Sequence, residues 1–507
     1  MQLPDEFKRM FQAVFGDEQW RSYLCALEAP PQKGVRVNFL RTQPELHDVF
    51  SAHFEPIPWA RDAYFIAQED RLGKDPLHAS GCLYVQEPSA MAPVEVLAPR
   101  PNERVLDLCA APGSKTTQIA AFMDNSGFLL ANDPEPKRSV ILAENVERMG
   151  VLHAQVTQLL PEHLAPHYQS YFDRILVDAP CSGEGMFRKE TEAIAAWHGD
   201  LPGQSADRQL GILESAYRML ADGGRLVYST CTLNPIENEA VCAVFSARHP
   251  EVKLQKASLP EARAGLSGID LYEASQRYDK LAKWLACHGV DPRSAHTEYA
   301  IRYFPHLSRG EGHFIACFEV KRKAHVGDAQ DTQARPKRPN SQGADLIQAF
   351  TQFANSFFTH GFLQRLESTH KLHVDHTVLY AIPAQIDLAH GVLRAGLPLA
   401  SMPHRHLVPS HALALAMTPG DTEHEVRLAY GDQRIVDFLM GREILIDELA
   451  TSKNITADGW VWVTLAGAPL GFGKKVGRVV KNHYPKGLRR PYVFALDESV
   501  LDSPKHL

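Results

Sequence analysis

Two cysteines lie at the ends of predicted strands, where their thiols could act as nucleophiles. Cys181 follows the strand predicted for residues 172–178, and Cys231 ends the strand predicted for residues 224–231. A structural cysteine would more often lie in the middle of a strand as a small apolar side chain. A thiol becomes a good nucleophile near neutral pH once its pKa is lowered, and we expect the helix N-termini after both turns to lower it. The two positions predict thiol chemistry at one edge of a sheet.

The turn of residues 109–114 has the features of a nucleotide-binding turn. It joins a predicted strand, 104–108, to a predicted helix, 115–123. Its two alanines and Gly113 let a ligand approach the backbone, and the helix N-terminus offers free N–H groups to an anion. The turn matches neither GxGxxG nor a P-loop, so an ordinary strand–helix turn stays open as the alternative.

Asp133 ends the next predicted strand, 127–133, and stands 26 positions after Asp107 (133 − 107). In doubly wound folds an acid at the end of the second strand binds ribose hydroxyls. The alternative is an ordinary cap ahead of Pro134.

The elements that must position these residues alternate along the chain. Further strands are predicted at 151–157, 172–178 and 224–231, and helices at 135–149 and 204–220, the second helix ended by Asp222-Gly223-Gly224. Asn234 is expected to cap the next helix, with Glu237 completing a capping box. This alternation predicts an α/β fold with a mostly parallel sheet covered on both faces. The ligand of such a sheet lies beyond the carboxyl ends of its strands.

Length and composition indicate a globular protein of several domains. The 507 residues predict two to four domains, and the 44% hydrophobic and 22% charged residues are ordinary values. No run of 18 apolar residues occurs and MQLPDEFKRM is not a signal peptide, so we expect a cytoplasmic protein. The eight cysteines form no CxxC pair, which fits reduced thiols and argues against a zinc site.

We expect five units along the chain. They are an N-terminal extension (1–80), an α/β domain (81–320), a polar linker (321–343), a middle unit (344–428) and a small β-rich unit (429–507). In the first unit an apolar helical face is expected from Phe7, Met10, Phe11, Val14 and Phe15. Arg36 is interpreted as a phosphate contact or as a surface arginine. The middle unit contains His404, His406 and His411, but no cysteine or carboxylate at ligand spacing, so no metal is predicted.

The last unit contains a basic run in a protein of net charge −7. Residues 459–496 contain no Asp or Glu, and the aromatic residues Phe472 and Tyr484 are interleaved with His483 and the cations. The cations are Lys474, Lys475, Arg478, Lys481, Lys486, Arg489 and Arg490. Such a local excess favours contact with a phosphate backbone, and a solvated basic face is the alternative.

Six motifs spread between residues 36 and 316 resemble those of the RNA (cytosine-5) methyltransferases of the Nop1/Nop2/Sun family. They are RVN (36–38), YVQEPSAM (84–91), LDLCAAPGSKTTQIA (106–120), DAPCSGEGMFRK (178–189), YSTCTLNPIENE (228–239) and GEGHFIA (310–316). Beyond them, PSHALA (409–414) and GAPLGFGKKV (467–476) look like the bacterial RsmF-type ribosomal RNA members, which carry a PUA-like RNA-binding tail.

This resemblance implies a Rossmann-like class I domain that binds S-adenosylmethionine, flanked by an N-terminal α+β RNA-binding extension and by C-terminal α+β and PUA-like modules. The residues implied in cofactor binding are Cys109, Ala110, Ala111, Pro112, Gly113, Ser114, Lys115, Asp133, Arg138 and Asp178. Many family members have an Asp near the adenine, where this chain has Val156-Thr157-Gln158, so the adenine contact at Gln158 stays open.

The resemblance also implies roles for the two thiols. Cys231 would add to carbon 6 of cytosine, Asp178 would stabilise charge at ring nitrogen 3, and Cys181 would help release the product. Lys189 and Arg188 would orient the base or its phosphate, or form a surface pair. Lys474, Lys475, Arg478 and Lys481 would contact RNA.

The implied partner is small-subunit (16S) ribosomal RNA, free or within an assembled 30S subunit, bound by a monomer. A tRNA substrate stays open, and so does a non-catalytic RNA-binding assembly protein that keeps the fold. The presence of the predicted catalytic residues argues against a non-catalytic protein. A DNA cytosine-5 methyltransferase would use the Pro-Cys thiol as its nucleophile and lack the Thr-Cys corner, so Cys231 argues against it.

Overall fold

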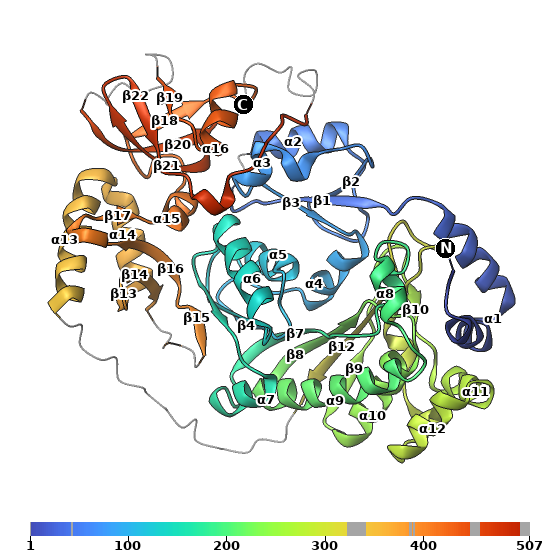
Figure 1. Cartoon of the computed structure of the whole chain (residues 1–507). Coiled ribbons are helices and arrows are strands. Elements are labelled where there is room, and N and C mark those ends of the chain that lie inside the picture. Colours follow the sequence, from blue (N-terminus) through green and yellow to red (C-terminus); the bar gives the residue numbers. More distant parts are fainter. Residues whose placement is uncertain are drawn as a thin grey trace.

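A ten-stranded mixed sheet crosses the middle of the molecule (Figure 1). The computed structural model describes residues 2–41, 44–321, 341–384, 388, 391–446 and 457–496. The sheet order is β10 (Arg263–Ala264), β11 (Ile301–Tyr303), β12 (His313–Val320), β8 (Leu220–Thr230), β7 (Phe172–Asp178), β4 (Arg104–Asp107), β5 (Phe128–Asn132), β6 (Ala154–Thr157) and β15 (Val392–Arg394), and β9 (Val252–Gln255) pairs with β12.

The five strands from β8 to β6 are parallel, as predicted. One face is covered by α4 (Ala92–Leu97), α5 (Ser114–Phe122) and α6 (Pro136–Arg148), and the other by α7 (Pro161–Leu164), α9 (Leu201–Met219) and α10 (Val241–Arg248). Successive residues of β4 explain this layering, because Val105 packs into the first layer and Leu106 into the second. Buried on both faces, these strands hold their C-terminal ends at one edge.

The remaining five strands lie antiparallel to their neighbours, so the sheet is less parallel than predicted. The strand β12 was not predicted, and it pairs with β8 so that Phe314 lies opposite Thr230. This pairing brings the residue before it, His313, next to the corner at Cys231.

Two predicted helix boundaries differ from the structure. The helix predicted to run to Leu220 ends at Met219, because β8 already starts at Leu220, which pairs with Phe172. Asn234 does cap the following helical turn, accepting an N–H from Ile236 at 3.1 Å. Glu237 does not complete a capping box, because its carboxylate is bound by Ser182.

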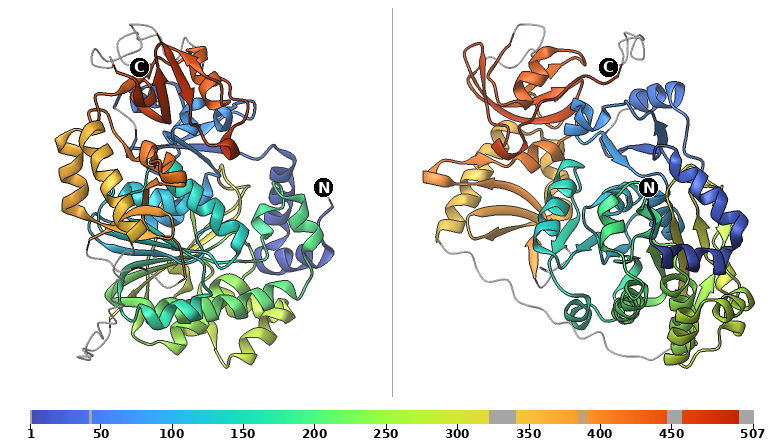
Figure 2. Two further views of the ribbon diagram at one scale, coloured as in Figure 1. Left: turned by 60° about the vertical axis from the view of Figure 1, so that its left-hand side comes forward. Right: turned by 45° about the vertical axis from the view of Figure 1, so that its right-hand side comes forward.

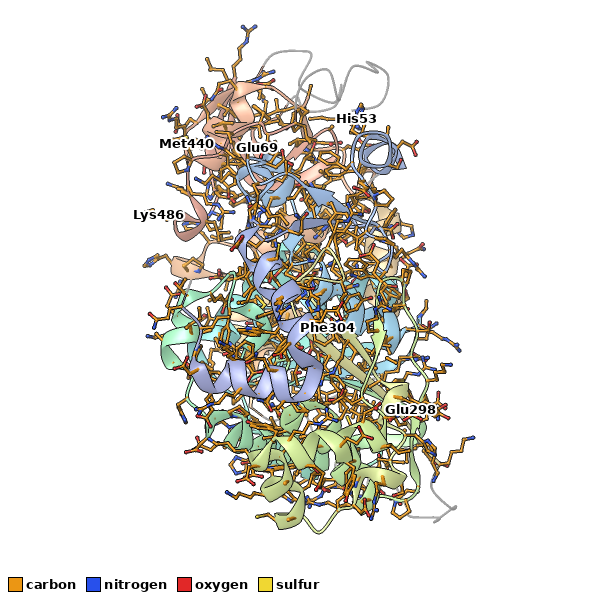
Figure 3. All side chains as sticks on the ribbon, turned by 90° about the vertical axis from the view of Figure 1, so that its right-hand side faces the viewer. His53, Glu69, Glu298, Phe304, Met440 and Lys486 are labelled. Atoms are coloured by element: carbon orange, nitrogen blue, oxygen red, sulfur yellow. The ribbon has the colours of Figure 1, made fainter. Side chains whose placement is uncertain are left out.

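The N-terminal unit consists of α1 (Asp5–Glu28) and a sheet of β2 (Ala63–Ile66), β1 (Lys33–Val37) and β3 (Leu83–Gln86), with α2 (Pro44–His53) and α3 (Pro76–Ala79) beside it. The apolar face of α1 is confirmed, since Phe7, Met10 and Phe11 are buried. The Phe15 and Phe304 rings are 5.3 Å apart, and Figure 3 labels Phe304 beside α1. β3 begins after residue 80 and belongs to this sheet.

The middle unit contains α13 (Ser341–Phe357), α14 (His360–Thr369) and a sheet of β13 (His370–Asp375), β14 (Val378–Pro383), β16 (Leu397–Ser401) and β17 (Val408–Pro409), followed by α15 (His411–Ala416). It also contributes β15 to the central sheet, where β15 pairs with β6. Most of the predicted linker, residues 322–340, lies outside the described residues.

The last unit is a five-stranded sheet of β18 (Glu425–Leu428), β20 (Gly459–Leu465), β21 (Ala468–Val476), β22 (Val479–Asn482) and β19 (Ile444–Leu445), with α16 (Gln433–Leu439). β18 precedes residue 429 yet pairs with β20, so this sheet starts earlier than the predicted unit. Both views of Figure 2 show the unit beside the N-terminal sheet, and Val35 and Val426 belong to one buried cluster. Among the described residues, no helix is long and apolar enough to cross a membrane.

Candidate active site

The turn of residues 109–114 leaves β4 at the C-terminal edge of the sheet and enters α5. Its shape is fixed by backbone bonds, because the Ala110 N–H donates to the Asn132 carbonyl (2.9 Å) and the Gly113 N–H donates to the Ala110 carbonyl (2.8 Å). Gly113 has φ +107°, and a Cβ there would lie 3.1 Å from Cδ1 of Leu142. The glycine is required by both conformation and space.

Asp133 lies immediately after β5 and is buried against this turn. Its Oδ2 accepts the Ala111 N–H at 3.2 Å and its Oδ1 accepts the Glu135 N–H at 3.0 Å. Arg138 lies 3.5 Å from Oδ2 and donates to the Ala111 carbonyl at 2.7 Å. Asp133 therefore caps a turn, as one interpretation of the sequence had it, and its contact with a ribose stays a prediction.

Asp107 is the last residue of β4, and its surroundings show that a cationic ligand group would fit beside the turn. It is fully buried, its Oδ2 accepts a hydrogen bond from Thr116 (2.7 Å), and its Oδ1 has no partner among the described residues. Burial raises the pKa of Asp107 to about 7. An uncompensated buried carboxylate is costly, and the ammonium of an amino-acid moiety would supply the missing donor and charge.

Asp178 ends β7 and lies between the turn and the two cysteines. Lys115 Nζ contacts its Oδ2 at 2.6 Å, and the Ser229 hydroxyl donates to its Oδ1 at 2.7 Å. Burial works to raise the pKa of Asp178, but the charge of Lys115 and these hydrogen bonds outweigh it, so the pKa is lowered. Asp178 is thus an anion held in place at the edge of the sheet.

The two predicted cysteines meet, with 3.3 Å between Sγ of Cys181 and Sγ of Cys231. Both are free thiols and partly buried. The hydrogen bond to Cys231, burial and the charges of Cys231 and Glu237 raise the pKa of Cys181 well above its usual value. The expectation that helix N-termini lower the pKa of both thiols is therefore wrong for Cys181, because its hydrogen bond to Cys231 and its burial outweigh the turn.

A buried polar network joins the two cysteine corners. The Ser182 and Thr232 hydroxyls are 2.8 Å apart, and Glu237 accepts the Ser182 N–H at 2.9 Å and the Gln209 amide at 3.0 Å. Burial and repulsion from Glu184 raise the pKa of Glu237 to about 8. Because each residue that follows a cysteine is held by this network, the two thiols are kept at a fixed separation.

His313 is a site residue that sequence reasoning did not single out. It is buried, its Nε2 lies 3.8 Å from Oδ1 of Asp178, and neither ring nitrogen has a hydrogen-bond partner among the described residues. Burial and the charge of Lys115 lower its pKa to about 4, so the ring is neutral. The sequence signal that could have indicated His313 is the GEGHFIA motif, which contains it.

Arg36 was interpreted as a phosphate contact or a surface residue; the surface reading is wrong, and the phosphate contact stays a prediction. It is buried and donates to Gln86 (2.8 Å), the Ser114 carbonyl (2.8 Å) and Thr117 (2.9 Å). Its guanidinium therefore ties the N-terminal sheet to the first turn of α5, next to the nucleotide-binding turn.

The predicted RNA-binding residues divide into exposed and buried ones. The Arg188 side chain is only 7% exposed and is bound by Glu311 (2.9 Å) and the Ala26 carbonyl (3.0 Å), so it braces the fold and does not offer its guanidinium to RNA. Lys475 is also buried, 3.7 Å from Asp458. The residues that the structure leaves exposed are Lys189, Lys474, Arg478 and Lys481. Lys474 and Lys481 are neighbours on β21 and β22.

The structure has a parallel strand core, a small-residue turn after its first strand, and acidic groups at the same edge, which are features of class I methyltransferases and of other nucleotide-binding folds. Models of the N-terminal domain of 16S rRNA methyltransferase RsmF, of 16S rRNA methyltransferase RsmB/F and of the RsmF PUA domain match residues 3–88, 94–319 and 425–490. The chain belongs to this RsmF family of methyltransferases. It uses S-adenosylmethionine, and the predicted fold and family are confirmed.

Similar proteins cover nearly the whole chain. Ribosomal RNA small subunit methyltransferase F of Shewanella oneidensis is 31% identical and aligns over 94% of each chain. The protein of the same name from Citrobacter koseri is 30% identical over 96% of this chain and 97% of its own. A crystal structure of a methyltransferase homolog protein from Pyrococcus horikoshii is 29% identical, with a TM-score of 0.50, and covers 62% of this chain and 93% of that one.

Proposed function

We propose that this enzyme methylates carbon 5 of a cytidine in small-subunit ribosomal RNA through a covalent adduct between Cys231 and the base. The observation that carries the proposal is the thiol pair, with sulfurs 3.3 Å apart and adjacent to the anionic Asp178. Carbon 5 of cytosine is a poor nucleophile, and addition of a thiolate at carbon 6 makes it an enamine carbon. One thiol would add to carbon 6, and the second thiol would help to release the methylated base.

The proton between the two sulfurs sets their order. In the proposed order Cys181 keeps its proton, because its pKa is raised well above the usual value, and Cys231 is the nucleophile. Cys231 then forms the bond to carbon 6, and the electron pair of the 5,6 double bond becomes available at carbon 5. S-adenosylmethionine, when bound, supplies an electrophilic methyl group to that carbon.

The same pair accounts for release. The hydrogen bond to Cys231 and the charge of Cys231 are among the causes that raise the pKa of Cys181. Both causes vanish once Cys231 is a thioether, so Cys181 becomes more acidic in the adduct and gives its proton to solvent, which its partial exposure allows. Cys181 then takes the proton from carbon 5, the 5,6 double bond forms again, and Cys231 leaves with the electron pair of the carbon–sulfur bond.

Asp178 and Lys115 complete the proposed site. Their ion pair lies at the same edge, and a carboxyl or ammonium group beside the base can stabilise charge that develops on the ring. On the cofactor side, Asp133 would receive the ribose hydroxyls and Asp107 the ammonium group. Cys109, Ala110, Ala111, Pro112, Gly113, Ser114, Lys115 and Arg138 would surround the remainder, and the adenine contact near Gln158 stays a prediction.

The substrate is inferred from the relatives' names and from charge. The relatives are named small-subunit ribosomal RNA methyltransferases, and the exposed cations Lys474, Arg478 and Lys481 form a basic face on a unit that matches a PUA domain. Phosphate contacts of this kind supply affinity without reading sequence. We also infer a cytoplasmic protein from the proposed ribosomal RNA substrate, and the N-terminal unit beside the basic unit would share in holding the RNA.

Methylation in vitro followed by bisulfite sequencing tests the proposal. Purified protein and S-adenosylmethionine are incubated with small-subunit ribosomal RNA, with assembled small subunits and with total tRNA, and Cys231→Ser serves as the matched control. We expect one new 5-methylcytosine in ribosomal RNA or in the subunit, absent with the variant. A 5-methylcytosine in tRNA alone would overturn the substrate, and no 5-methylcytosine in any RNA would overturn the reaction.

A further inference from the structure

A cavity of about 840 Å³ lies at the edge of the sheet opposite the active site. Asn102 and Arg104 line it at the start of β4, Gly127 and Phe128 at the start of β5, and His153 just before β6, whereas the active-site residues follow the other ends of these strands. Three parts of the chain enclose it, since Arg41 comes from the N-terminal unit and α14 of the middle unit forms the facing wall. A volume of this size suits a small-molecule site.

Arg41 places a buried positive charge at this cavity. Only 9% of the residue is exposed, and its Nε and Nη2 have no hydrogen-bond partner among the described residues. Nη1 makes one long bond of 3.4 Å to the Met417 carbonyl. The guanidinium lies directly against Gly150, where any Cβ would fall 1.6 Å from Nη2. A buried charge without a counter-ion is costly, and an anion in the cavity would compensate it.

His153 supplies an acceptor on the same wall. Its Nδ1 lies 3.2 Å from Oδ1 of Asn125, an oxygen that also accepts the Leu152 N–H at 3.0 Å. Nδ1 is therefore the protonated nitrogen, and Nε2, which is buried without a partner among the described residues, has a free lone pair. A ligand hydroxyl or amino group would satisfy it.

The other lining residues add no negative charge. Among the described residues, no Asp or Glu lines the cavity. Arg104 and Arg365 also line it, but they are paired with Asp173 and Asp421, so among the described residues Arg41 is the lining arginine without a carboxylate partner. The facing wall is partly apolar and includes Phe362, Leu366 and Leu397.

We propose that this cavity is a second ligand site, separate from the cofactor site, which binds a nucleotide. The phosphate would lie on Arg41, a ribose hydroxyl or exocyclic amine would donate to Nε2 of His153, and the base would rest on the apolar wall of α14. The nucleotide is either a free mononucleotide or one residue of an RNA strand, because both present the same groups.

Thermal unfolding of the full chain with saturating S-adenosylhomocysteine tests this site, since the cofactor pocket is then filled. The probes are adenosine 5′-monophosphate and a single-stranded RNA tetranucleotide, each at millimolar concentration. We expect one or both to raise Tm in a saturable manner, and which of them does so identifies the source. If neither probe raises the Tm of the wild-type protein, the proposal is overturned.

Arg41→Met removes the charged guanidinium and keeps an unbranched apolar stem, while Arg277→Met removes an exposed arginine of α11 (Gly268–Arg277) that pairs with Glu273. We expect Arg41→Met to bind the active probe about tenfold or more weakly, because a charged hydrogen bond is lost. Its Tm without probe should not fall, because no carboxylate partner is left unpaired.

Ser368→Trp, on the exposed end of α14, should block the cavity by bulk in a chain that retains Arg41. Undiminished probe binding in both cavity variants would overturn the proposal.

Discussion

Replacing Asp133 by asparagine tests how the cofactor's ribose is held. The two carboxylate oxygens accept the N–H groups of Ala111 (3.2 Å) and Glu135 (3.0 Å). Asparagine offers one acceptor oxygen and one NH₂ donor, so it must turn a donor toward one of these N–H groups and loses the charge that would bind hydroxyls. We expect the affinity for S-adenosylmethionine to fall by about 1–3 kcal/mol, or about 5- to 150-fold in Kd.

Calorimetry with two ligands separates contact with the ribose from support of the turn. The ligands are S-adenosylhomocysteine and its 2′-deoxy analogue, each titrated into wild type and Asp133→Asn. If Asp133 contacts the ribose, wild type binds the 2′-deoxy analogue more weakly and the variant binds both ligands nearly equally. The reason is that loss of the carboxylate and loss of the hydroxyl remove the same contact. Arg138→Met is the control, since it removes the bond to the Ala111 carbonyl and should weaken both ligands alike. Additive losses, or an unchanged affinity, would refute the ribose contact and leave Asp133 as a turn cap.

Two further predictions concern the cysteine corners and the basic face. Since burial raises the pKa of Glu237 from 4.5 to about 8, its contribution to stability is present below pH 4.5 and is lost as the pH rises through 8. Urea unfolding should show wild type losing stability relative to Glu237→Gln, by on the order of a few kcal/mol between these limits, and parallel pH profiles would contradict this. On the basic face, Lys474→Gln and Lys481→Gln should each reduce the salt slope of RNA binding by about 1. Lys475→Gln, which removes a buried lysine, should leave the slope nearly unchanged, and equal effects of all three would show that the face is not a specific phosphate contact.

Local patterns predicted the catalytic edge of the sheet well. The strand–turn–helix around Gly113 and the strand before Asp178 were predicted to within a residue or two, because buried parallel strands are short apolar runs and their turns need small residues. The meeting of Cys181 and Cys231 could be expected as well, since parallel strands bring their carboxyl ends to one edge.

The sequence could not reveal pairings between distant segments. Arg188 looked free for RNA because its partner Glu311 stands 123 positions further along the chain. The unit boundaries were placed by composition, but Val35 and Val426 share one buried cluster, so the last unit packs against the first. The strand β15 leaves the middle unit to extend the central sheet by pairing with β6, and no local periodicity reports such a pairing.

Trapping the protein–RNA adduct tests the proposed chemistry most directly. Wild type, Cys181→Ala, Cys231→Ala and the double variant are incubated with substrate RNA and S-adenosylmethionine and separated on a denaturing gel. We predict a covalent complex that accumulates with Cys181→Ala, because the carbon 5 proton is no longer removed, and no complex with Cys231→Ala or the double variant. A complex that accumulates with Cys231→Ala and disappears with Cys181→Ala would reverse the roles of the two thiols and contradict the account.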